Sequence, residues 1–187
     1  VFIGKEAGLS STSGIDNVFI GKGAGLSITN VSDNVFIGKE AGLNANLGTS
    51  DNTFIGKEAG KQTSTGADDN VFVGEMAGLN NTTASDNTYI GSRAGRGLAN
   101  GTGHRNTAVG SKAGYKLSTG HRNVMLGDSA GIDLGAGYSN TFVGQASGAN
   151  TADGDYNTFV GFKAGYDNNR TNSSVNANRN TYIGNRC

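Results

Sequence analysis

The stretch Asn17–Gly25, NVFIGKGAG, returns as NVFIGKEAG at Asn34–Gly42 and as NTFIGKEAG at Asn52–Gly60. Each copy has an asparagine, three apolar or β-branched residues, a glycine and then an Ala-Gly pair. The glycine after the apolar residues recurs eleven times, at steps of 17 to 19 residues and a last step of 23. A fixed period near this length is typical of solenoids, whose units cannot bury their apolar face alone. The eleven glycines are Gly4, Gly21, Gly38, Gly56, Gly74, Gly91, Gly110, Gly127, Gly144, Gly161 and Gly184.

The apolar part of each unit predicts a short strand. It is too short for a helix, and it consists of strand-forming residues such as Val18-Phe19-Ile20 and Thr88-Tyr89-Ile90. Asparagine before it and glycine after it are turn formers. We therefore expect one all-β segment over residues 1–187, a parallel β-solenoid of about eleven coils. At ~4.8 Å per coil it would form a rod roughly 50 Å long.

The two ends and one long connection complete this organisation. The chain begins and ends within a repeat, which favours a segment of a longer repetitive protein. Variation in repeat length should bulge between the Ala-Gly pair and the next asparagine. The longest such insertion is expected at residues 166–178.

Side chains in a strand alternate between two faces, so the coil should have an inner and an outer set. We assign the residue before each repeat glycine to the core because it is always Ile, Val or Leu. These predicted core residues are Ile3, Ile20, Ile37, Ile55, Val73, Ile90, Val109, Leu126, Val143, Val160 and Ile183.

The middle strand residue is then expected to point outward, as a stripe of aromatic side chains. Monomers rarely expose such a stripe, so two further copies of the chain should cover it in a homotrimer. The predicted inter-chain seam consists of Phe2, Phe19, Phe36, Phe54, Phe72, Tyr89, Phe142, Phe159 and Tyr182. Two adjacent copies have Ala108 and Met125 at this position.

The leading asparagines should stack from coil to coil, because one side-chain amide can donate to the carbonyl of the next. This predicted ladder comprises Asn17, Asn34, Asn52, Asn70, Asn87, Asn106, Asn123, Asn140, Asn157 and Asn180. The Ala-Gly pairs indicate that two walls of the coil approach closely, with glycines in special backbone conformations at the corners.

Composition excludes several classes of function. The 15 basic and 15 acidic residues cancel, which argues against nucleic acid as the main partner. No apolar run approaches the ~18 residues of a membrane span, so no membrane contact is expected from this segment. Glycine makes up 32 of the 187 residues, about 17% against a usual ~7%. Apolar residues make up 35%, below the usual ~45–50%. This composition is incompatible with one thick core.

Charged residues form two columns in the N-terminal half. An aspartate precedes the asparagine at positions Asp16, Asp33, Asp51, Asp69 and Asp86. A lysine follows the glycine at Lys5, Lys22, Lys39 and Lys57. The aspartates are weak candidates for a Ca²⁺ site, since Ca²⁺ prefers several oxygen ligands; a plainer interpretation pairs them with the lysines. Further along, the aspartate is replaced by Arg105, Arg122, Ser139, Tyr156 and Arg179.

No constellation typical of catalysis is present, and no cofactor is expected. His104 and His121 lie in matching GHRN segments and should stack. Two imidazoles could share a metal or sense pH, but a transition-metal site usually needs three or four ligands. The alternative is a recurring surface-loop residue.

The Asn-x-aromatic-Ile-Gly-x-x-Ala-Gly unit resembles the head repeats of trimeric autotransporter adhesins and related bacterial and phage fibre proteins. The resemblance covers the whole chain, although the family repeat is shorter and has Ala where this chain mostly has Phe. It implies a left-handed, trimeric β-roll on a cell-surface or virion-surface fibre.

The function that follows is a non-enzymatic extracellular fibre or adhesin segment, a rigid rod for surface attachment or filament structure. Its expected partners are copies of itself and a host-matrix, glycan or cell-surface receptor. The alternative is the shaft of a phage tail fibre. Two more distant alternatives are an ice-binding solenoid and a glycan-degrading solenoid; the first needs a regular Thr array, and the second needs clustered acids or bases.

Overall fold

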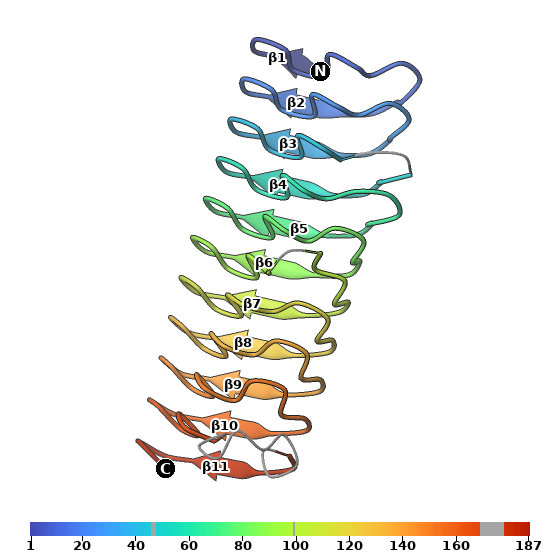
Figure 1. Cartoon of the computed structure of the whole chain (residues 1–187). Helices are drawn as coiled ribbons and strands as arrows, with labels where there is room; N and C mark the ends of the chain where they lie inside the picture. The colour runs from blue at the N-terminus through green and yellow to red at the C-terminus, as the bar shows by residue number, and fades with distance from the viewer. Residues whose placement is uncertain (46–47, 99, 169–177) are drawn as a thin grey trace.

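The computed structural model describes residues 1–45, 48–98, 100–168 and 178–187. These residues form a stack of coils, each of which contributes one short strand to a single parallel sheet (Figure 1). The strands are β1 (Phe2–Ile3), β2 (Val18–Ile20), β3 (Val35–Ile37), β4 (Thr53–Ile55), β5 (Val71–Val73), β6 (Thr88–Ile90), β7 (Thr107–Val109), β8 (Val124–Leu126), β9 (Thr141–Val143), β10 (Thr158–Val160) and β11 (Thr181–Ile183). The predicted all-β, parallel β-solenoid is confirmed.

The sheet follows the order of the sequence, and equivalent repeat positions pair. Phe36 of β3, for example, lies opposite Phe19 of β2 and Phe54 of β4. The opposite wall of the coil is also joined by backbone hydrogen bonds, as from the nitrogen of Gly25 to the oxygen of Ala41 (2.9 Å). Both walls therefore use their backbone polar groups to hold neighbouring coils together, as buried backbone requires.

The aromatic residues fill the inside of the coils, which overturns the predicted inter-chain seam. From β2 to β10 the middle strand residue is at most 2% exposed. Phe36 and Phe54 stack with ring centroids 4.8 Å apart and planes 5° from parallel. The residues predicted as seam but found in this interior column are Phe19, Phe36, Phe54, Phe72, Tyr89, Phe142 and Phe159, with Phe2 and Tyr182 continuing it into the two end coils.

The aliphatic residue before each glycine lies on the outer side of the sheet, so its assignment to the core was wrong. None of these side chains is buried, and Ile55, Ile90 and Leu126 are 37–40% exposed. The positions concerned are Ile3, Ile20, Ile37, Ile55, Val73, Ile90, Val109, Leu126, Val143, Val160 and Ile183. Alternation along a strand defines two sets of side chains but does not say which set faces inward.

The Ala-Gly pair makes room for the ring. Gly42 has φ of +56°, and a Cβ placed on it would lie 2.5 Å from the ring of Phe36. The preceding Ala41 is fully buried against the same interior. The small residues therefore accommodate an aromatic side chain between the walls.

The glycine that ends each strand is required for a different reason than the glycine of the Ala-Gly pair. Gly21 has φ of +135°, and a Cβ on it would lie 2.5 Å from the carbonyl oxygen of Gly38 in the next coil. Any side chain here would push two coils apart, which explains why the glycine recurs in every repeat.

Of the insertion expected at 166–178, residues 169–177 lie outside the described part of the chain. In the part that is described, no helix has the length and apolar character needed to cross a membrane.

Candidate functional site

The outer sheet face is a regular surface that runs along the stack of strands. We define it as the first and third residues of each strand, from Val18 and Ile20 in β2 to Thr158 and Val160 in β10. The first residue is Val or Thr and the third is Ile, Val or Leu, and all of them are partly exposed. No charged residue interrupts this face over nine consecutive strands. An uncharged aliphatic stripe of this length is the kind of surface that protein interfaces cover.

The exit turn carries charged residues at one edge of this face. We define it as the two residues after each strand-ending glycine, from Lys5-Glu6 to Asn185-Arg186. Here Lys39 lies 3.6 Å from Glu40, and Lys57 lies 3.6 Å from Glu75 of the next coil. Pairing of lysine with aspartate, predicted within one chain or between chains of a trimer, is therefore wrong within the chain for these lysines: they pair with glutamates, because the strand separates them from the aspartates.

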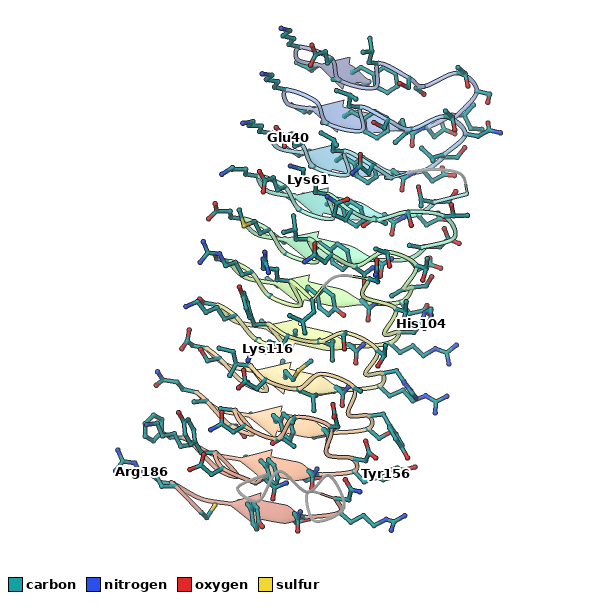
Figure 2. All side chains as sticks on the ribbon, viewed as in Figure 1. Glu40, Lys61, His104, Lys116, Tyr156 and Arg186 are labelled. Atoms are coloured by element: carbon teal, nitrogen blue, oxygen red, sulfur yellow. The ribbon has the colours of Figure 1, made fainter. Side chains whose placement is uncertain are left out.

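A partly buried ion pair joins Glu40 of the exit turn to Lys61 of the next coil. Lys61 Nζ lies 2.6 Å from Glu40 Oε2 (Figure 2). The hydrogen bond from Lys61 holds the pKa of Glu40 below its ordinary 4.5, and the same bond raises the pKa of Lys61 above 10.5. Both groups stay charged at neutral pH.

The entry corner lies at the other end of the strands, and a ladder of asparagines forms its inner side. Each asparagine from Asn34 to Asn180 donates Nδ2 to Oδ1 of the asparagine one coil earlier, at 3.0–3.3 Å. Asn34 also donates to the oxygen of Thr49 (3.0 Å), and Asn70 donates to the oxygen of Ala84 (2.9 Å). The ten predicted ladder positions thus form one continuous network, and the side chains from Asn17 to Asn157 are buried.

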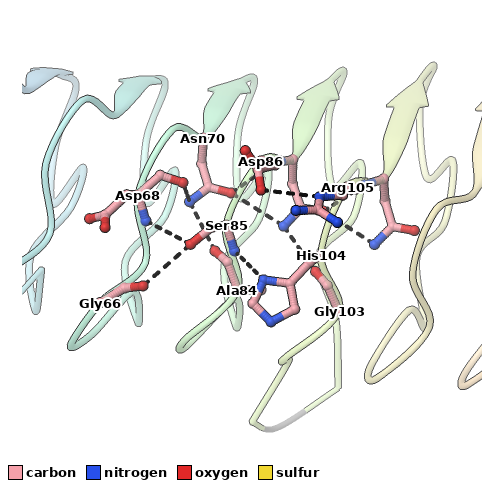
Figure 3. Close-up of polar contacts among 11 residues, drawn as sticks. Gly66, Asp68, Asn70, Ala84, Ser85, Asp86, Gly103, His104 and Arg105 are labelled. Atoms are coloured by element: carbon pink, nitrogen blue, oxygen red, sulfur yellow. Dashed lines mark hydrogen bonds and ion pairs between the residues drawn. The ribbon is translucent and has the colours of Figure 1, made fainter.

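The outer side of the entry corner consists of the two residues before each asparagine. The side chain of the first of these two residues often accepts a hydrogen bond from the backbone nitrogen of the equivalent residue one coil earlier. Ser85 Oγ accepts from the nitrogen of Asp68 (3.0 Å), and His104 Nδ1 accepts from the nitrogen of Ser85 (2.9 Å) (Figure 3). His104 therefore has a structural role that the sequence analysis missed, although Ser, Asp and Asn at equivalent positions share its ability to accept.

The second of the two residues always has a left-handed backbone conformation. Asp16, Asp33, Asp51, Asp69 and Asp86 have φ of 57–61°, and so do Arg105, Arg122, Ser139, Tyr156 and Arg179. Aspartate is among the residues that tolerate this conformation best. The aspartates are exposed and form one column, but in the described part of the chain no three His, Cys, Asp or Glu side chains lie close enough to hold a metal ion.

In the C-terminal half the entry corner becomes basic and aromatic. Arg105 lies 3.5 Å from Asp86, where the column changes sign. His121 stacks on Tyr138 (5.3 Å between centroids). The predicted stacking of His121 on His104 is therefore wrong. The Arg179 guanidinium lies over the ring of Tyr156, 5.5 Å from its centroid. An interaction with Tyr156, chiefly a hydrogen bond, raises the pKa of Tyr138.

Comparisons with known proteins give no match. No family model matches the chain, and neither a curated protein nor a solved structure does so.

Proposed function

We propose that this chain is a segment of an extracellular fibre, a rigid repetitive rod that serves surface attachment or filament structure without catalysis. The observation that carries the proposal is the stacking of equivalent residues from coil to coil. The strands and the asparagine amides continue along the stack, and so do the aromatic rings except at Ala108 and Met125. Such a stack grows by adding repeats and keeps the same cross-section, which suits a spacer or display rod.

The rod is proposed to self-associate through its outer sheet face, in a homotrimer. The predicted trimer rested on exposed aromatic rings, and those rings are buried. The same physical argument now applies to the aliphatic residues of the outer sheet face, which are partly exposed along nine strands. Because each coil presents a similar Val/Thr and Ile/Val/Leu pair, copies of the chain can pack together along their whole length.

The extracellular location, on a cell or virion surface, rests on the resemblance to adhesin heads and fibre proteins. The neutral net charge agrees with a partner other than nucleic acid. This chain mostly has Phe where the family repeat has Ala. Because these rings are buried, the Phe side chains fill the interior of the coil and leave its outer surface unchanged.

Sedimentation equilibrium and light scattering of the whole chain test this proposal. We expect a species of three times 19.0 kDa, seen as a rod by electron microscopy. The double variant Ile55→Lys/Ile90→Lys places two charges on the outer sheet face and should be monomeric with an unchanged circular dichroism spectrum. The matched control, Glu75→Lys, adds a lysine at the exit turn and should remain trimeric. A wild-type chain that is monomeric at high concentration would contradict self-association.

A further inference from the structure

We propose that the C-terminal half of the entry corner binds an acidic polysaccharide, through carboxylate or sulfate groups on the glycan. The site, here called the basic strip, consists of His104, Arg105, His121, Arg122, Tyr138, Tyr156 and Arg179. It deepens the proposed adhesive function by naming a class of ligand. His104 and Tyr156, two members of the strip, lie along the same edge of the rod (Figure 2).

The residues of the basic strip are not explained by the needs of the backbone. Arg105, Arg122, Tyr156 and Arg179 occupy the left-handed position that aspartate occupies in the N-terminal coils. A left-handed non-glycine residue costs roughly 1–3 kcal/mol, and Asp reduces this cost by local hydrogen bonding. Replacement of Asp by Arg and Tyr at this position therefore gives up a favourable residue, and a role for the new side chains in binding accounts for it.

A shallow hollow lies at the N-terminal end of the basic strip. It has a volume of about 400 Å³ and is lined by Asp86, His104, Arg105, His121 and Arg122. This volume falls within the ~300–1,000 Å³ of small-molecule sites. One sugar unit with an acidic group is therefore a suitable occupant.

The donors around this hollow suit an oxyanion. Because His104 Nδ1 accepts a hydrogen bond from Ser85, the neutral ring carries its proton on Nε2 and can donate it. Arg105 is partly engaged with Asp86, whereas in the described part of the chain no acidic side chain pairs with Arg122. The exposed Arg122 guanidinium can thus bind a carboxylate or sulfate through two parallel hydrogen bonds.

Aromatic rings continue the strip from the hollow toward the C-terminus. His121 stacks on Tyr138, and Tyr138 meets Tyr156 edge to face (5.1 Å between centroids). Tyr156 is 49% exposed. The apolar C–H face of a sugar ring can pack on such exposed rings while its acidic group pairs with a neighbouring arginine. Asp155, an acidic residue next to Tyr156, accepts a hydrogen bond through its carboxylate from the nitrogen of Tyr138 (3.0 Å).

The charge density favours a glycan over nucleic acid. Arg105, Arg122 and Arg179 are spread over four coil steps, about 19 Å at ~4.8 Å per step. Double-stranded DNA carries one negative charge per ~1.7 Å, far more than three guanidinium groups can neutralise.

Binding measurements on the whole chain test the inference. The probes are a heparin oligosaccharide, an oligogalacturonate, neutral dextran and a double-stranded DNA oligomer. We expect the sulfated or the carboxylated glycan, or both, to bind, and dextran not to bind. Binding should weaken with added salt, as ion pairing requires.

A pair of matched variants locates the site. Arg122→Asn and Lys112→Asn each remove one positive charge from an exposed residue with left-handed φ (59° and 55°), and Asn tolerates this conformation. Arg122→Asn should weaken glycan binding by at least about tenfold, the loss expected for a charge-assisted contact. Lys112→Asn, at the exit turn, should change it less than about twofold.

Three results would overturn the inference: no binding of either acidic glycan, equal loss in the two variants, or DNA binding as tight as glycan binding. The monomeric Ile55→Lys/Ile90→Lys variant separates this inference from the proposed fibre, because the basic strip does not include the outer sheet face. Binding that persists in this variant supports the strip whatever the oligomeric state of the wild type. Binding that is lost in it would count against a site contained within one chain.

Discussion

Most coils have two positions at which a residue other than glycine has a left-handed backbone. One lies in the entry corner, such as Asp51 (φ 59°), and the other lies in the exit turn, such as Glu58 (φ 58°). These positions reverse the chain direction at the two ends of the strand. Their side chains point away from the core, so the sequence is free to vary charge there while the coil keeps its path. Variation in side-chain charge is therefore concentrated at residues whose backbone is the most constrained.

Buried hydroxyl groups offer the clearest prediction at the scale of one residue. Thr63 is fully buried and its Oγ1 has no hydrogen-bond partner. Equivalent positions in other coils hold Ile28, Ala45, Leu117 and Leu134, which are also buried. The change Thr63→Val keeps the shape and removes an unsatisfied polar group, so we expect the free energy of unfolding to rise by about 1–2 kcal/mol. Urea unfolding followed by circular dichroism measures this change.

The control for this prediction is Thr53→Val, the same substitution on the outer sheet face. Thr53 is partly exposed, so its hydroxyl group can reach water, and the expected change in stability is within about 0.5 kcal/mol. Equal effects of the two substitutions would show that β propensity, rather than the buried hydroxyl group, is responsible.

At the scale of the strand stack, the aromatic column is interrupted at β7 and β8, where Ala108 and Met125 replace the rings. Both are fully buried. Gly114 belongs to the same coil as Ala108, and a Cβ placed on it would lie 2.9 Å from Cε of Met125. The methionine side chain thus reaches across into the space left by the alanine. The two residues compensate each other's volume.

This compensation predicts strong coupling between two substitutions. Ala108→Phe alone should be destabilising by about 1–3 kcal/mol, because the new ring competes with Met125 for the same space. Met125→Phe alone should also be destabilising, because its planar ring leaves a cavity beside Ala108. The double variant restores the ring-on-ring stacking found from β2 to β5 and should recover most of the loss. Urea unfolding of the four proteins gives the coupling free energy, expected at about 0.5–3 kcal/mol.

A distant pair serves as the comparison for this cycle. Ala108→Phe combined with Thr53→Val involves residues in β7 and β4 that share no neighbours, so their effects should add. If Ala108→Phe and Met125→Phe were also additive, the two side chains would not share one space, and the explanation for the interruption would be wrong.

Residue spacing was sufficient to predict the strands but not the direction of their side chains. Val35-Phe36-Ile37 is β-branched, aromatic and bounded by turn residues, and it forms β3 as expected. The choice of face depended on whether Ile37 or Phe36 was the better core residue, and hydrophobicity alone does not separate them. The deciding signal was Gly42, whose missing Cβ leaves the space that the Phe36 ring occupies. The Ala-Gly pairs predict walls that approach closely, whereas in the structure they make room for a large side chain opposite.

The candidate site was predictable to a similar degree. The change from aspartate to arginine after Asp86 is visible in the sequence, and so is the asparagine ladder. The stacking of His121 on Tyr138 was not predicted. These two residues precede the left-handed Arg122 and Ser139, and their contact depends on the backbone conformation of two adjacent loops. Pairing of charges also needed the structure, since the strand places Lys39 and Asp33 at opposite ends of a coil.

At the scale of the whole molecule, the zero net charge conceals an ordered distribution. The interior contains aromatic rings and asparagine amides, the outer sheet face is uncharged, and most of the charges lie in the entry corner and the exit turn. The entry corner is acidic from Asp16 to Asp86 and basic from Arg105 onward. The proposed self-association and the proposed glycan binding would therefore use different surfaces of one chain.

The repetitive stack also predicts that a whole coil can be removed. Deletion of residues 18–34 removes 17 residues and joins Asn17 to Val35. The asparagine ladder and the aromatic column then both continue, with Phe2 facing Phe36 in place of Phe19. Because each coil contacts only its neighbours, we expect the shortened chain to fold, with the same circular dichroism spectrum per residue. Its urea m-value should be lower by about one-eleventh, since m scales with the surface that is exposed on unfolding.

Deletion of residues 19–34 is the matched control, because it removes 16 residues and leaves Val18 as one extra residue between Asn17 and Val35. The asparagine and the phenylalanine of that coil can then no longer both keep their columns, since one added residue moves the following side chains to the opposite face. We expect this variant to lose several kcal/mol of stability relative to the in-register deletion, about the cost of exposing a buried Phe together with a broken amide ladder. Equal stability of the two deletions would mean that the columns inside the coil do not set the register of the stack, and the structural basis for a continuous rod would fail with them.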